Sequence, residues 1–157
     1  MNDDIVDVQG AWRHNGFGLA NSPEVLASRA AGAGADLSGA ILFYYTAYER
    51  ALESDGWAFD PAGWRPRAAA GSAAVGDDVH EPAAEAITLL GYDVVVFNDF
   101  LEHSPVSCNG VAGALPVNRH CLFESLEGAI NAIDTGAFGD GCEDGLYTVF
   151  AVYRVGQ

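Results

Sequence analysis

Residues 99–108 carry the side chains best suited to chemistry, and they follow directly on an apolar run. Residues 94–97 are β-branched or aromatic, which is typical of a buried strand. The side chains after this run can act as acids, bases or nucleophiles: Asp99, Glu102, His103, Ser104, Ser107 and Cys108. Because open α/β sheets usually bind ligands in loops at the carboxyl ends of their strands, a site is first expected in this segment.

A cysteine nucleophile needs a base within hydrogen-bond reach and a third group that orients the base. Cys108, His103 and Asp99 supply these three residue types, with His120 or Glu102 as substitutes. The spacing matches no recognised cysteine-enzyme signature, and a free cysteine usually behaves as a small buried apolar residue. A cysteine-dependent hydrolase or transferase is therefore the alternative hypothesis rather than the leading one.

Metal binding is a weaker possibility. Its candidate ligands are Cys108, Cys121, Cys142 and His120. Structural zinc sites usually bring their ligands in closely spaced pairs, whereas the gaps between these cysteines are 13 and 21 residues. We therefore predict no metal site and no cofactor.

The charge of the chain limits its partners. The net charge is −15 over 157 residues, the pI is about 4.2, and all seven basic residues are arginine because the chain has no lysine. Such a surface repels nucleic-acid phosphates and anionic membranes, so neither is an expected partner, while a basic protein would be attracted. Solubility or adaptation to salt explains the same composition without any partner.

The location of the protein is predicted from its first residues and its cysteines. The chain starts Met-Asn-Asp-Asp, which is acidic where a secretory leader is basic, and no apolar core of a leader follows. An odd number of cysteines with irregular spacing favours reduced thiols over a disulfide framework. Both observations predict a cytoplasmic protein.

Two helices are predicted in the first third of the chain. Ser22 and Pro23 form a good N-cap and first-position pair, and the helix should end at the pair Gly32 and Gly34. Apolar and aromatic residues then recur with the 3.6-residue period over residues 36–56, with Asp36 as N-cap. The tyrosines of this second helix are expected to be core residues.

Two more helices are predicted further along. One is a short helix at residues 83–90 that ends at Gly91, and the other spans about residues 119–135 with Asn118 as N-cap. The apolar face of the latter contains Leu122, Leu126, Ala129, Ile130 and Ile133.

Strands are predicted at residues 5–12, 92–98 and 146–155. Both faces of the last are apolar, which is typical of a central strand covered on each side. The fold class is therefore α+β, with helices packed on a small central β-sheet and a possible β-α-β unit in the C-terminal half. We expect a single domain, 1–157, with a mobile Ala/Gly-rich loop at residues 68–80.

Small size, strong acidity and several aromatics together resemble, in composition only, bacterial or phage inhibitor proteins such as toxin-immunity and acidic anti-defence proteins. The resemblance implies a protein that blocks a basic partner. Its contact candidates are Asp99, Glu102, Glu124, Glu127, Asp140, Glu143 and Asp144, with Trp57 and Trp64 as aromatic anchors. A salt-adapted globular domain without a special partner is the third hypothesis.

Overall fold

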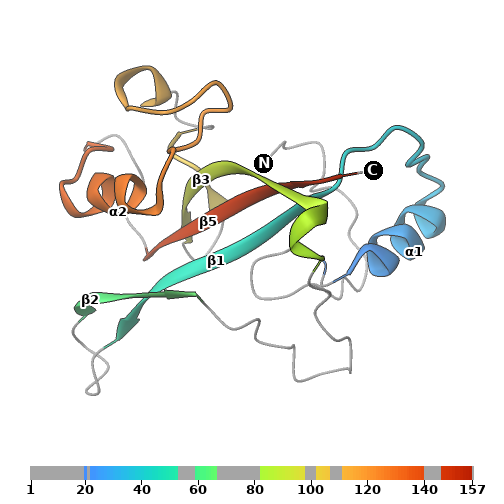
Figure 1. The fold of residues 1–157 in the computed structure, drawn as a ribbon, viewed down its shortest axis with the longest axis horizontal. Helices are drawn as coiled ribbons and strands as arrows, with labels where there is room; N and C mark the ends of the chain where they lie inside the picture. Colours follow the sequence, from blue (N-terminus) through green and yellow to red (C-terminus); the bar gives the residue numbers. More distant parts are fainter. Residues whose placement is uncertain are drawn as a thin grey trace.

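The computed structural model describes residues 20, 22–52, 59–66, 82–97, 102–106, 111–139 and 146–156. Within these residues, five strands form one antiparallel sheet in the order β2-β1-β5-β3-β4 (Figure 1). The strands are β1 (Phe43–Leu52), β2 (Phe59–Pro66), β3 (Ile87–Phe97), β4 (Glu102–His103) and β5 (Leu146–Val155). The helices are α1 (Pro23–Ala33) and α2 (Leu126–Asp134), with short 3₁₀ turns at Ala84–Ala86 and Val111–Ala114. The predicted strand at 5–12 and loop at 68–80 lie outside the described residues.

The α+β class is confirmed, and β5 has the predicted bounds and the predicted central position. Its middle residues are buried, as expected for a strand with apolar side chains on both faces. The suggested β-α-β unit is wrong as a parallel crossover, because β3 and β5 are neighbours that run antiparallel. The segment between them, which includes α2, therefore connects antiparallel neighbours. No described helix is long and apolar enough to cross a membrane.

Residues 43–52 form a strand, so the helix predicted over residues 36–56 is wrong. The first four residues of β1 are aromatic or β-branched and suit a pleated sheet. Pairing with β5 on one side and β2 on the other decides the conformation. Asp36, the predicted N-cap, instead accepts hydrogen bonds from the backbone N–H and the hydroxyl of Ser38.

Helix α1 begins and ends where the sequence predicts. The Ser22 hydroxyl accepts the backbone N–H of Val25 at 3.3 Å, and Gly34 ends the helix in the left-handed conformation with φ of 68°. None of its residues is buried. In Figure 1 α1 lies near the carboxyl end of β5, whereas α2 lies near the start of that strand. Helix α1 therefore contributes no buried residue to the core.

The short helix predicted at residues 83–90 is wrong beyond its first turn. After the 3₁₀ turn the chain enters β3 at Ile87, and the register shifts between Leu89 and Gly91. Gly91 has φ of +145°, and a Cβ there would lie 2.7 Å from the Cβ of Leu122 and 2.7 Å from the carbonyl oxygen of Phe123. The glycine that was expected to end a helix instead permits a bulge in a central region of the sheet.

Helix α2 is shorter than predicted. Its N-cap is Ser125, whose hydroxyl accepts the N–H of Gly128 at 3.0 Å. Asn118, the predicted N-cap, lies in a turn before the helix. Its side-chain oxygen accepts hydrogen bonds from the N–H groups of His120 and Leu122, and its amide donates to the Leu90 carbonyl. The predicted apolar face is confirmed for Leu126, Ala129, Ile130 and Ile133, which are buried or pack on the core, whereas Leu122 is buried ahead of the helix.

The main core lies between α2 and one face of the sheet. It is a cluster of Val94, Val106, Phe123, Ala129, Ala132, Phe138 and Val149. The Phe138 ring stacks on Tyr147 at 5.6 Å and meets Phe123 edge-on at 6.4 Å. Such aromatic contacts fix the position of the chain after α2.

Arg50 connects α2 to the edge of the sheet. Its guanidinium carbon lies 5.2 Å from the ring centroid of Trp64, its partner in register on β2, and the group forms an ion pair with Asp134 at the end of α2. A cation over an aromatic ring and a partly exposed ion pair each contribute on the order of 0.5–1 kcal/mol. Together they help to hold the helix against the strands.

Candidate functional site

The predicted catalytic residues are not brought together by the described structure. The backbone of His103 lies in β4, paired with Val96 of β3. Asp99 and Cys108 lie outside the described residues. The cysteine-enzyme hypothesis therefore stays a prediction. A thiol-labelling test of Cys108 needs a Cys121→Ser background, since the thiol of Cys121 is exposed and free.

The weak metal candidates Cys121 and His120 are exposed in the turn that follows Asn118. Cys121 has φ of 57° there, a left-handed conformation that suits the turn. Within the described part of the chain, no group of three or more His, Cys, Asp or Glu side chains could hold a metal ion. Cys108 and Cys142 lie outside that part.

The predicted contact residues divide into three groups. Glu124 and Glu127 are exposed around the N-terminus of α2, where a carboxylate also stabilises the helix through its dipole. Trp64 is half-buried against the core and beneath Arg50, so its ring packs within the protein. Of Glu102 only the backbone is described, in β4. Those outside the described residues are Asp99, Asp140, Glu143, Asp144 and Trp57.

The most unusual described surface is a group of tyrosines that we call the tyrosine face: Tyr44, Tyr48, Tyr92 and Tyr153. Tyr44 lies opposite Tyr153, Tyr48 opposite Val149, and Tyr92 opposite Ala151. Directly paired residues, and residues two apart along a strand, share a face of the sheet, so all four rings lie on the same side. This is also the side that α2 covers further along, at Val94 and Val149.

The rings of the tyrosine face contact one another without stacking flat. The centroids of Tyr44 and Tyr153 are 5.8 Å apart with planes at 43°, and those of Tyr48 and Tyr92 are 6.5 Å apart at 60°. All four side chains are half-buried. Tyr48 and Tyr92 also pack against the main core, yet each of the four side chains keeps part of its surface exposed, so the group can still pack against a further molecule.

Two hydroxyls of the tyrosine face, those of Tyr48 and Tyr153, have pKa values above the ordinary range for tyrosine. Burial raises the pKa of Tyr153 above 10.0, and the neighbouring phenols of Tyr48, Tyr92 and Tyr44 raise it further. The pKa of Tyr48 is likewise raised, first by burial and then by Tyr92. At neutral pH the hydroxyls of Tyr48 and Tyr153 are therefore uncharged donors and acceptors, each beside an apolar ring.

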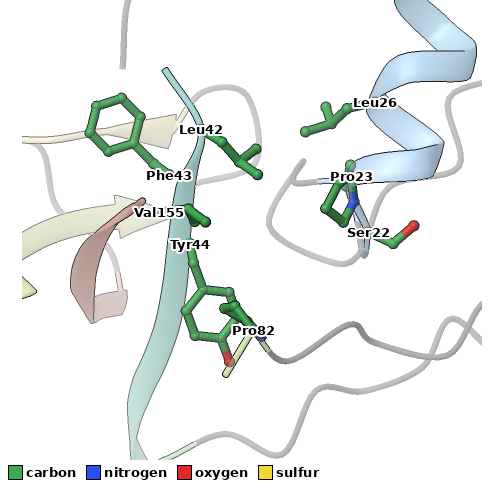
Figure 2. A pocket seen from close by; sticks show the side chains of 9 residues that line it. Ser22, Pro23, Leu26, Leu42, Phe43, Tyr44, Pro82 and Val155 are labelled. Carbon is green, nitrogen blue, oxygen red and sulfur yellow. The ribbon is translucent and has the colours of Figure 1, made fainter. Parts of the chain in front are cut away.

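A small hollow adjoins the tyrosine face at Tyr44. Figure 2 shows Leu26 and Pro23 of α1 on one side of it, with Leu42 and Val155 on the other and Pro82 beside the Tyr44 ring. Its volume of about 90 Å³ is well below the roughly 300 Å³ at which pockets start to enclose a metabolite. The hollow therefore extends an apolar surface and does not enclose a small molecule.

The opposite face of the sheet holds a half-buried carboxyl, Asp93. Its Oδ1 accepts the hydroxyl of Ser104 at 2.6 Å and the backbone N–H of Val94 at 2.9 Å. Burial raises the pKa of Asp93, although the Ser104 hydrogen bond opposes the shift. The pKa of Tyr45 on the same face is raised by burial and by the charge of Asp93. Carboxyls with a perturbed pKa often mark active sites. Here the two donors that contact Asp93, the Val94 N–H and the Ser104 hydroxyl, instead satisfy hydrogen bonds along the edge of β3.

Neither the tyrosine face nor Asp93 was predicted as a site. Tyr44 and Tyr48 are four residues apart and therefore share a face in a strand as well as in a helix. The sequence alone could thus show that these two rings lie on one face. The signal for Asp93 is its position within an apolar strand, where aspartate is rare. Tyr92 and Tyr153 join the group only through strand order, which the sequence does not give directly.

Comparison of the chain with protein-family models, with curated proteins and with solved structures finds no match.

Proposed function

We propose that this protein is a small acidic binding protein of the inhibitor type, acting in the cytoplasm, that engages a basic protein through the tyrosine face. The observation that carries the proposal is the gathering of four half-buried tyrosines from three neighbouring strands on one side of the sheet. Tyrosine is enriched at the energetic centres of protein interfaces, because its ring buries a large area and its hydroxyl satisfies a polar partner.

The net charge supplies the long-range part of the interaction. At −15 the protein attracts basic surfaces and repels acidic ones, which raises the rate of encounter with a basic partner. Exposed carboxylates such as Glu124 and Glu127 contribute to that field. In this proposal the charge selects the class of partner and the rings supply affinity.

The test begins with capture of partners at low salt from the lysate of the native host, followed by release at high salt. The recovered protein is then purified, and its affinity is measured by calorimetry against wild type, Tyr153→Leu and Phe43→Leu. Tyr153→Leu removes a ring from the tyrosine face, whereas Phe43→Leu makes the same kind of change on the opposite face, opposite Arg154. We expect Tyr153→Leu to weaken binding at least about fivefold and Phe43→Leu to change it little.

A second pair of variants tests the acidic part. Glu124→Lys with Glu127→Lys should slow association and flatten its dependence on salt, with little effect on dissociation. If a folded Tyr153→Leu protein and the double charge reversal both bind the captured partner as wild type does, the proposal is wrong. Recovery of no basic protein would favour the salt-adapted domain instead.

A further inference from the structure

The tyrosine face presents aromatic rings on a protein whose net charge of −15 attracts cations. The quadrupole of a tyrosine ring attracts a cation to its face, and arginine is the more frequent partner because its planar guanidinium also stacks. Among the described residues, the arginines on the strands of the tyrosine face are Arg50 on β1 and Arg154 on β5, and neither competes for its rings. Arg50 is ion-paired with Asp134, and Arg154 lies on the other side of the sheet.

The protein already holds one guanidinium in this way. Arg50 follows Tyr48 by two positions on β1 and so lies on the same side of the sheet. There it is placed over the ring of Trp64 and beside the carboxylate of Asp134. This side of the sheet therefore holds a guanidinium between an aromatic ring and one carboxylate.

The dimensions of the tyrosine face suit an extended chain. Tyr44 and Tyr48 are four residues apart on one strand, about 13 Å, and three neighbouring strands span about 10 Å. Side chains on one side of an extended segment repeat about every 7 Å. Two arginines separated by one residue therefore fit across the four rings.

We infer that the tyrosine face binds arginine side chains presented by an extended segment of a basic partner protein. The inference rests on the proposed function and specifies the chemistry of the partner. Arginine guanidinium groups stack on the exposed parts of the rings and donate hydrogen bonds to the hydroxyl oxygens. A segment with lysine keeps the charge but loses the planar stacking.

The probe is a short peptide in which arginine alternates with glycine. Two matched peptides carry lysine or citrulline at the same positions, since citrulline keeps the planar shape without the charge. Affinities for the full chain are measured by titration at physiological ionic strength, with the tyrosine ring signals followed by NMR. We expect the arginine peptide to bind roughly 2–5-fold more tightly than the lysine peptide, and the citrulline peptide to bind least.

The variants test whether the rings are responsible. Tyr153→Leu should weaken binding of the arginine peptide roughly 2–5-fold. Tyr153→Phe keeps the ring, so its affinity for that peptide should stay within about twofold of wild type. Phe43→Leu is the control on the opposite face. The inference is overturned if arginine and lysine peptides bind equally, or if Tyr153→Leu has no effect on the arginine peptide.

The two proposals fail separately. If the captured partner depends on Tyr153 while the peptides show no preference for arginine, the tyrosine face is a binding site but the arginine inference is wrong. If the arginine peptide depends on Tyr153 and the captured partner does not, the inference about ring chemistry stands and the proposed function fails.

Discussion

Asp93 is a carboxyl whose burial costs stability at neutral pH. Its pKa is raised above 3.8 by burial in the folded protein, so the folded state holds the proton more tightly than the unfolded chain does. A raised pKa contributes stability that is fully present below the unfolded pKa and is lost as the pH rises through the folded pKa. Asparagine at this position keeps an oxygen that can accept from Ser104 and Val94.

We therefore expect the stability of Asp93→Asn relative to wild type to increase as the pH rises from about 3.8 through the folded pKa, and then to level off. Urea unfolding at a series of pH values measures the difference. Asp36→Asn is the control of opposite sign, because hydrogen bonds from Ser38 lower the pKa of the exposed Asp36. A pH-independent difference for Asp93→Asn would contradict its burial.

Gly91 is the position where a single methyl group has no room. The added Cβ of Gly91→Ala would lie 2.7 Å from Leu122 Cβ and from the Phe123 carbonyl oxygen, at a φ of +145° that side chains rarely adopt. We expect a loss of about 1–3 kcal/mol in the free energy of unfolding, measured in urea. Gly113→Ala, with nothing within 4 Å of the new Cβ, should change it by less than about 0.5 kcal/mol. Equal effects at the two sites would show that the bulge can relax.

At the scale of the elements, the two helices have similar caps and different roles. Ser125 caps α2, which buries Ala129 and Ala132, whereas Ser22 caps α1, which buries no residue. Ser125→Ala should lower the free energy of global unfolding by about 1 kcal/mol, because α2 must stay folded for the core to form.

Ser22→Ala weakens a helix that can fray without exposing the core. Its effect on global unfolding should be under about 0.5 kcal/mol, with the change confined to faster amide exchange in α1. Hydrogen exchange followed by mass spectrometry distinguishes the two cases. A global loss from Ser22→Ala equal to that from Ser125→Ala would contradict the peripheral role of α1.

The elements also show what the sequence could and could not predict. β5 was predictable, because β-branched and aromatic residues on both faces over ten positions have no helical period. β1 was not, because residues four apart, such as Tyr44 and Tyr48, lie on one face of a helix and of a strand alike. The strand conformation of β1 is decided by its pairing with β2 on one edge and β5 on the other, which is a tertiary effect.

The candidate site was less predictable than the fold for a related reason. Its rings come from β1, β3 and β5, and their proximity depends on the strand order. The sequence pointed instead to reactive side chains, of which His103 and Ser104 lie in or beside β4. Ser104 turned out to donate to Asp93, a contact between positions eleven residues apart that depends on the β3–β4 pairing.

At the scale of the whole molecule, salt should act in opposite directions on stability and on binding. The charge of −15 repels itself in the compact state, so added NaCl should raise the free energy of unfolding in urea by screening that repulsion. The same screening should weaken association with a basic partner. Stability and affinity measured over one series of NaCl concentrations test this, with KCl as the control for ion identity. Parallel changes in the two would contradict an electrostatic origin.

The central position of β5 has a consequence for how the protein is made. β1 and β3 both pair with β5, the last of the five described strands, and Phe43 pairs with Arg154 across more than a hundred intervening positions. Contacts that span such distances are slow to form, and a sheet cannot close while its middle strand is missing. During synthesis, β1 and β3 therefore emerge from the ribosome with their inner edges unpaired. That interval, in which those edges can join another chain, is when a chaperone would be of most use.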